Sequence, residues 1–86
     1  MSHQLLVVDD SLTMQKVIQI AFEREDFRVI TSGSGGDGLA QARARKPHAI
    51  LLDVTLPDGD GFGFCEQFKA DPEIGSIPIL MLASAG

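Results

Sequence analysis

Short apolar runs alternate along this chain with segments whose apolar residues recur every three or four positions. The apolar runs cover residues 5–8, 48–54 and 77–83, and the sequence FRVITS (27–32) predicts a further short strand. Runs of this kind are typical of short parallel strands buried on both faces. With a helical segment between each pair of predicted strands, the order β-α-β-α-β-α-β predicts an α/β fold. Its sheet would be parallel and doubly wound, with right-handed crossovers and helices on both faces.

The three helical segments have recognisable starts and stops. Ser11 is the expected N-cap of a first helix that ends near residues 24–26, and its apolar positions are Met14, Val17, Ile18, Ala21 and Phe22. A second helix is expected over 39–46, stopped by Pro47, and a third over about 62–69. The sequences GSGGDG (33–38) and TLPDGDG (55–61) predict loops, because glycine, proline and aspartate favour turns.

The length and composition narrow the class of protein. With 86 residues and neither a repeat nor a linker, residues 1–86 are expected to form a single domain. The net charge of −5 argues against nucleic acid or a membrane surface as the main partner. A lone cysteine, Cys65, excludes an internal disulfide. With no secretion signal or membrane span in evidence, we expect a cytoplasmic protein.

Three aspartates stand where two of the predicted strands end. Asp9 and Asp10 follow the first strand, and Asp53 ends the third. Ligands of an open parallel sheet bind beyond the carboxyl ends of its strands. Two adjacent carboxylates about 4 Å apart repel by roughly 4 kcal/mol at an effective dielectric of 20. A Mg²⁺ ion would offset that repulsion, and we favour this interpretation over three unrelated, solvated acids.

The sequences VVDDSLTMQKVI, AILLDVTLPDGDGF and IPILMLASAG, in this order and spacing, resemble a bacterial response-regulator receiver domain. The most specific part is the acidic pair combined with the pattern formed by Asp53, Pro57, Asp60 and Gly61. The resemblance implies a flavodoxin-like fold with strand order 2-1-3-4 for the part present here. It also implies that the chain is shortened at its C-terminus, without the fifth strand and its flanking helices.

The resemblance further implies a role for each site residue. Asp53 would be the phosphoacceptor, taking a phosphoryl group from a histidine kinase or a phosphotransfer protein. Asp10 would bind Mg²⁺ directly, Asp9 would assist partly through water, and the backbone carbonyl of Thr55 would be a further ligand. Such a domain is a phosphoacceptor in two-component signal transduction and not a turnover enzyme.

Two departures from the family pattern leave a second function open. Ala83 stands where receivers carry threonine or serine, and Ser84, the next residue, would normally point the other way because strand side chains alternate. The lysine that follows strand five in receivers lies outside these 86 residues. The alternative is a pseudo-receiver, an interaction module that forms a homodimer through the edge of the fourth strand and the neighbouring helical surface.

Two enzyme-like interpretations rank behind these. Gly33, Gly35 and Gly38 spell the G-x-G-x-x-G of a dinucleotide-binding loop. That motif normally follows the first strand of its fold, and a dinucleotide site would leave the aspartates unexplained. A haloacid-dehalogenase-type phosphatase would need a second acid two residues after its nucleophile, a position that Thr55 occupies here.

Overall fold

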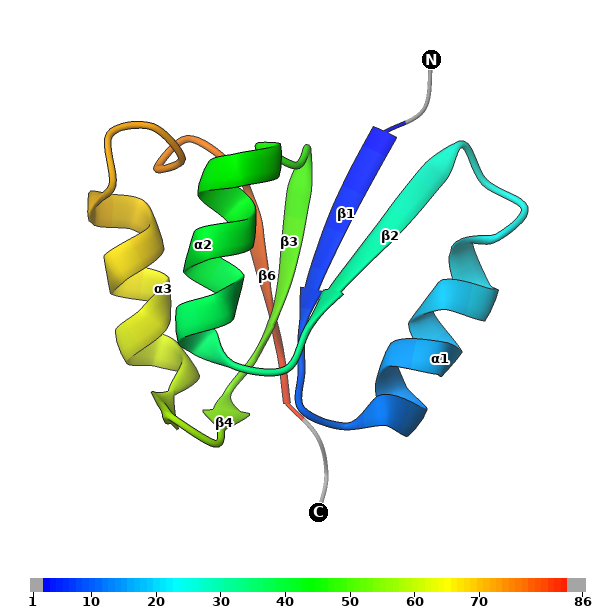
Figure 1. Ribbon diagram of the computed structural model, residues 1–86, viewed down its shortest axis with the longest axis horizontal. Helices are drawn as coiled ribbons and strands as arrows, with labels where there is room; N and C mark the ends of the chain where they lie inside the picture. The colour runs from blue at the N-terminus through cyan, green and yellow to red at the C-terminus, as the bar shows by residue number, and fades with distance from the viewer. Residues whose placement is uncertain (1–2, 84–86) are drawn as a thin grey trace.

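The computed structural model describes residues 3–83, and its centre is a four-stranded parallel sheet (Figure 1). Its strands are β1 (His3–Val8), β2 (Phe27–Ser32), β3 (Ala49–Asp53) and β6 (Ile79–Leu82), arranged in the order β2-β1-β3-β6. All three pairings are parallel. Because β6 is the fourth strand expected from the sequence, the doubly wound α/β fold and the order 2-1-3-4 are confirmed.

Helices cover both faces of this sheet (Figure 1). Helix α1 (Leu12–Phe22) lies on one face, and helices α2 (Gly35–Arg45) and α3 (Gly61–Ala70) lie on the other. As expected, Ser11 caps α1: its hydroxyl oxygen accepts a hydrogen bond from the Met14 N–H at 3.1 Å. Within residues 3–83, no helix combines the length and apolar character needed to cross a membrane.

Alternation along the strands sorts the apolar side chains into two core clusters. Leu6 and Val8 of β1 face α2 and α3, whereas Leu5 and Val7 face α1 and its Ile18. Strand β1 is therefore buried on both faces, which explains its unbroken apolar run. The larger cluster also holds Leu39, Ala42, Ile50, Leu52, Leu56, Phe68 and Ile74.

The GSGGDG segment is not the loop that its composition predicted. Helix α2 begins at Gly35, and the hydroxyl oxygen of its N-cap, Ser34, accepts a hydrogen bond from the Asp37 N–H at 3.2 Å. Tertiary packing overrides the low helix propensity of glycine here. A Cβ at Gly38 would lie 2.8 Å from the Val8 side chain, so the missing side chain lets α2 pack closely on β1.

The TLPDGDG segment is also more regular than a loop. Strands β4 (Thr55–Leu56) and β5 (Gly59–Asp60) pair antiparallel, and Pro57 and Asp58 form the turn between them. Gly59 has φ of +154°, a conformation that suits glycine. The hairpin is tied to the core because Leu56 is buried in the larger cluster.

One end of the sheet is poorly covered on the α1 side. Helix α1 lies over the β2 end of the sheet, away from β6 (Figure 1). Leu80 of β6 is in register with Leu51 of β3 and so shares its face, the one that α1 covers. The result is that Leu80 is 66% exposed.

Candidate functional site

Three carboxylates meet at the carboxyl edge of the sheet. One oxygen from each of Asp9, Asp10 and Asp53 lies within 4.8 Å of the other two. They meet because β1 and β3 are neighbours that run parallel, which places the end of both strands at the same edge. Asp9 and Asp53 are buried and Asp10 is exposed, so the cluster opens to solvent through Asp10.

Asp9 is held in place by its neighbours in the chain and by β2. Its carboxylate oxygen Oδ1 accepts a hydrogen bond from the Ser11 N–H at 2.9 Å. Its backbone N–H donates to the Ser32 carbonyl at 2.9 Å. Its backbone carbonyl accepts a hydrogen bond from the side-chain amide of Gln15 (Nε2) at 2.6 Å. These contacts fix the turn from β1 into α1, and with it the position of the acidic pair.

Asp53 sits at the end of β3 with one oxygen engaged. Its Oδ1 accepts a hydrogen bond from the Thr55 N–H at 3.3 Å. Thr55 is the first residue of β4, so the hairpin starts beside the carboxylate. Behind it, the Gly61 N–H donates to the Val54 carbonyl at 2.9 Å, which closes the hairpin at its base. Gly61 also begins α3, one residue before the start expected from the sequence.

The electrostatics of the cluster favour a cation. Burial raises the pKa of the Asp9 carboxyl above its usual range, and the negative charges of Asp53 and Asp10 raise it further. The hydrogen bond from the Ser11 N–H acts in the opposite direction but does not cancel these effects. The folded state therefore opposes ionisation of Asp9. Keeping the cluster ionised costs free energy, and attraction to a bound cation would offset that cost.

The oxygen donors fit a hard divalent cation. Carboxylate oxygens in a cluster, one of them open to solvent, suit an ion such as Mg²⁺ that retains several of its waters. Burial of Asp9 and Asp53 limits how far these two side chains can move apart in response to their repulsion. The residues present therefore fit the ion that the sequence predicted.

The other residues singled out from the sequence have different surroundings. Ala83 follows β6 and is exposed, whereas Ser84 lies outside the described residues. Of the glycine motif, Gly35 and Gly38 are buried in α2 and Gly33 precedes it. The N–H of Gly35, which a phosphate bound at this helix end would need, already donates to the Asp58 carboxylate. This arrangement does not favour a dinucleotide loop.

The sequence did not reveal two residues that hold the segments around the site. Gln15 binds the Asp9 carbonyl from one turn into α1, and Asp58 binds the start of α2 from the tip of the hairpin. Nothing in the local sequence pointed to Gln15. Asp58 lies in a Pro-Asp-Gly turn signal, which identified the turn but not the partner of the side chain.

Comparisons with known proteins agree with this geometry. The family described as the response regulator receiver domain matches residues 5–86. The chain is 33% identical over 81 residues to protein PilH of Pseudomonas aeruginosa, covering 94% of this chain and 67% of PilH. It is 38% identical over 84 residues to the alkaline phosphatase synthesis transcriptional regulatory protein PhoP of Bacillus subtilis, covering 98% of this chain and 34% of PhoP. The chain thus spans about two thirds of one relative and one third of the other.

Solved structures show the same fold. The N-terminal domain of a response regulator receiver protein from Methanoculleus marisnigri has a TM-score of 0.91 and 38% identity, covering 98% of this chain and 68% of that one. The receiver domain of a sensor histidine kinase from Pseudomonas aeruginosa, solved with a magnesium ion coordinated in its active-site cleft, has a TM-score of 0.90 and 26% identity, covering 99% and 70%. An acidic cluster at the carboxyl edge of a 2-1-3-4 parallel sheet, together with these matches, places the chain in the response regulator receiver domain family.

Proposed function

We propose that this receiver domain accepts a phosphoryl group on Asp53 from a histidine kinase or a phosphotransfer protein, with Mg²⁺ held at the acidic cluster. The observation that carries the proposal is the convergence of Asp9, Asp10 and Asp53 within 4.8 Å at the carboxyl edge of the sheet. The ion would be held by these carboxylates and by the backbone carbonyl of Thr55. It would neutralise charge on the transferring group.

The residues of the chain supply the nucleophile and its orientation. A carboxylate oxygen of Asp53 attacks phosphorus, and a new O–P bond forms while the bond from phosphorus to the donor breaks. The electron pair of the broken bond leaves with the donor. Because the Thr55 N–H engages Oδ1, the acceptor carboxylate is held in a defined orientation before the donor arrives. Asp53 is also buried, so few other orientations are open to it.

The test is incorporation of phosphate from acetyl phosphate, measured by intact mass. With Mg²⁺ present, the wild-type chain is expected to gain the mass of one phosphoryl group, and Asp53→Asn is expected to gain none. Incorporation should be slower than in a receiver with threonine or serine at this position, because Ala83 offers no hydroxyl to the phosphoryl oxygens. The missing hydrogen bond to a charged group would be worth about 1.5–3 kcal/mol.

Two further variants sharpen this test. Asp10→Ala should remove the dependence on Mg²⁺ and reduce incorporation, whereas Glu66→Gln, which neutralises an exposed acid on α3, should leave both unchanged. Phosphate that still enters Asp53→Asn would place the acceptor elsewhere. A wild-type chain that binds Mg²⁺ without taking up phosphate would rule out the acceptor role and favour the pseudo-receiver alternative.

A second candidate function, a pseudo-receiver that acts as a dimerisation module, is supported by the exposed edge of the sheet. Within residues 3–83, the outer edge of β6 pairs with no other strand, and its Leu80 is 66% exposed. Two copies would associate through this edge as a homodimer, with antiparallel contact between the two β6 strands.

Sedimentation at micromolar concentration tests this association. The wild-type chain is expected to sediment as a dimer and Leu80→Lys as a monomer, because the lysine places a charge in the proposed interface. Ala40→Lys is the control: it adds the same charge at an exposed position of α2, on the opposite face of the sheet. A folded, monomeric wild-type chain would contradict the proposal.

A further inference from the structure

Asp58 connects the hairpin after the acceptor to the start of helix α2. Its Oδ1 accepts a hydrogen bond from the Gly35 N–H and its Oδ2 accepts one from the Gly36 N–H, both at 2.9 Å. These N–H groups belong to the first turn of α2, where backbone donors have no partner within the helix. A carboxylate is also favoured there by the helix dipole. Accordingly, the hydrogen bonds from Gly36 and Gly35 lower the pKa of Asp58.

The same hairpin contacts the acceptor at its other end. Asp58 lies in the turn between β4 and β5, and β4 begins with Thr55, whose N–H donates to Asp53 Oδ1 at 3.3 Å. The hairpin is thus fixed at its base by the chain around Asp53 and at its tip by α2. Moving the tip off α2 would tilt β4, and with it Thr55, relative to the acceptor carboxylate.

Close packing beside Asp58 leaves little room for any other arrangement. A Cβ at Gly35 would collide with the ring of Phe64 of α3, and a Cβ at Gly59 of β5 would lie 3.1 Å from the same ring. The aromatic ring therefore fills the space that these two glycines leave between α2 and the hairpin. Asp58 is the polar part of this contact, and it sets the direction in which the hairpin meets α2.

We propose that Asp58 is a positioning residue for the acceptor loop: by holding the hairpin tip on the N-terminus of α2, it sets the place of Thr55 beside Asp53. This inference rests on the proposed function for its consequence, since Thr55 would offer a carbonyl to Mg²⁺ and its N–H orients the nucleophile. Asp58 itself touches neither the ion nor the phosphoryl group and acts through Thr55.

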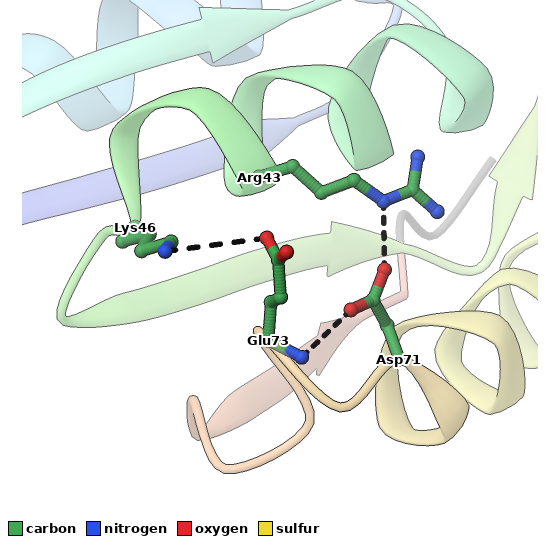
Figure 2. Close-up of polar contacts among 4 residues, drawn as sticks. All are labelled: Arg43, Lys46, Asp71 and Glu73. Atoms are coloured by element: carbon green, nitrogen blue, oxygen red, sulfur yellow. Dashed lines mark hydrogen bonds and ion pairs between the residues drawn. The ribbon is translucent and has the colours of Figure 1, made fainter.

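The chain contains a matched control at the other end of α2 (Figure 2). Asp71 Oδ2 accepts a hydrogen bond from Arg43 Nε at 2.7 Å, and its Oδ1 accepts one from the Glu73 N–H at 2.8 Å. Asp71 is thus an acid with two hydrogen bonds that also holds α2, and the Arg43 guanidinium lowers its pKa. The connection between α3 and β6 that follows Asp71 lies at the opposite end of the sheet from β4 (Figure 1).

Comparison of Asp58→Ala with Asp71→Ala separates positioning from stability. Both variants are expected to lower Tm, since each removes two hydrogen bonds: both bonds of Asp58 go to α2, whereas Asp71 has one to Arg43 of α2 and one to the Glu73 N–H. In Asp58→Ala alone, the NMR signal of the Thr55 amide should shift in metal-free protein, and the dissociation constant for Mg²⁺ should rise about 10-fold. Uptake of phosphate from acetyl phosphate should slow with it. Asp71→Ala should keep the wild-type values of all three.

The outcomes distinguish this inference from the proposed function. If Asp58→Ala exposes the Gly35 and Gly36 amides to hydrogen exchange but keeps the wild-type Thr55 signal, the positioning role is overturned. If the wild-type chain does not bind Mg²⁺, the proposed function fails, and the metal-free Thr55 signal still decides the role of Asp58. Asp58→Asn, which retains one acceptor oxygen, provides the same comparison with a milder change and is expected to show a smaller shift of Thr55.

Discussion

Phe68→Ala is expected to lower the free energy of unfolding by about 3–5 kcal/mol, the range for removing a buried aromatic side chain. Phe68 lies on the buried face of α3 and is fully inaccessible to solvent, within the core cluster that joins α2, α3 and the sheet. The substitution removes apolar contacts and leaves a cavity that the surrounding strands cannot close. Because small domains have little stability in reserve, a loss of this size would leave much of the protein unfolded at 37 °C.

Phe62→Ala is the matched control, since it makes the same substitution in the same helix. Phe62 is 58% exposed, so its loss should change the free energy of unfolding by less than about 1 kcal/mol. Urea denaturation followed by circular dichroism measures both variants. Equal losses for the two variants would show that α3 does not pack on the sheet through Phe68.

Gly61→Ala is expected to destabilise the fold by about 3 kcal/mol, near the upper end for overpacking. Gly61 is buried at the start of α3, directly behind the hairpin. A Cβ there would collide with the Asp53 carbonyl oxygen and lie 2.7 Å from the Cα of Val54. Both obstacles are backbone atoms, so no side-chain rotation relieves the clash, and the peptide that follows the acceptor must shift.

The same variant should also impair the site. The shift would strain the hydrogen bond from the Gly61 N–H to the Val54 carbonyl, which closes the hairpin base. We expect weaker Mg²⁺ binding from whatever fraction stays folded. Gly63→Ala, two residues on in α3, is the control. A Cβ there meets nothing within 4 Å, so the variant should gain up to about 1 kcal/mol from helix propensity. A stable Gly61→Ala with normal Mg²⁺ binding would contradict the close approach of α3 to Asp53.

The candidate site was predictable because the positions of its three acids depend only on where two strands end. Asp9 and Asp10 follow one apolar run and Asp53 ends another, and parallel strands bring such ends to one edge of a sheet. That argument requires only that the two strands be neighbours, which the resemblance to receivers also implied. The prediction that the three acids meet at one edge did not require their side-chain contacts.

The loops were less predictable than the strands because glycine-rich segments carry conflicting local signals. The GSGGDG segment has an N-cap residue in Ser34 but also four poor helix formers. The helix forms because buried Gly35 and Gly38 allow α2 to pack close to Phe64 and Val8. Local sequence does not reveal these long-range contacts. The short hairpin at 55–60 was likewise not predicted, because it is held by contacts with α2 and the core that local sequence does not reveal.

By itself, the sequence determined the order of the four sheet strands and three helices along the chain, the buried character of β1 and β3, and the edge at which three carboxylates gather. These features follow from short-range patterns: apolar runs, helical periodicity and acids at strand ends. The tertiary structure alone decided which loop residues bind one another across the chain. Asp58 meets Gly35 and Gly36 from more than 20 residues away, and Leu80 stays exposed because α1 lies over the far end of the sheet. Contacts of this kind depend on how whole elements pack, and no local pattern encodes them.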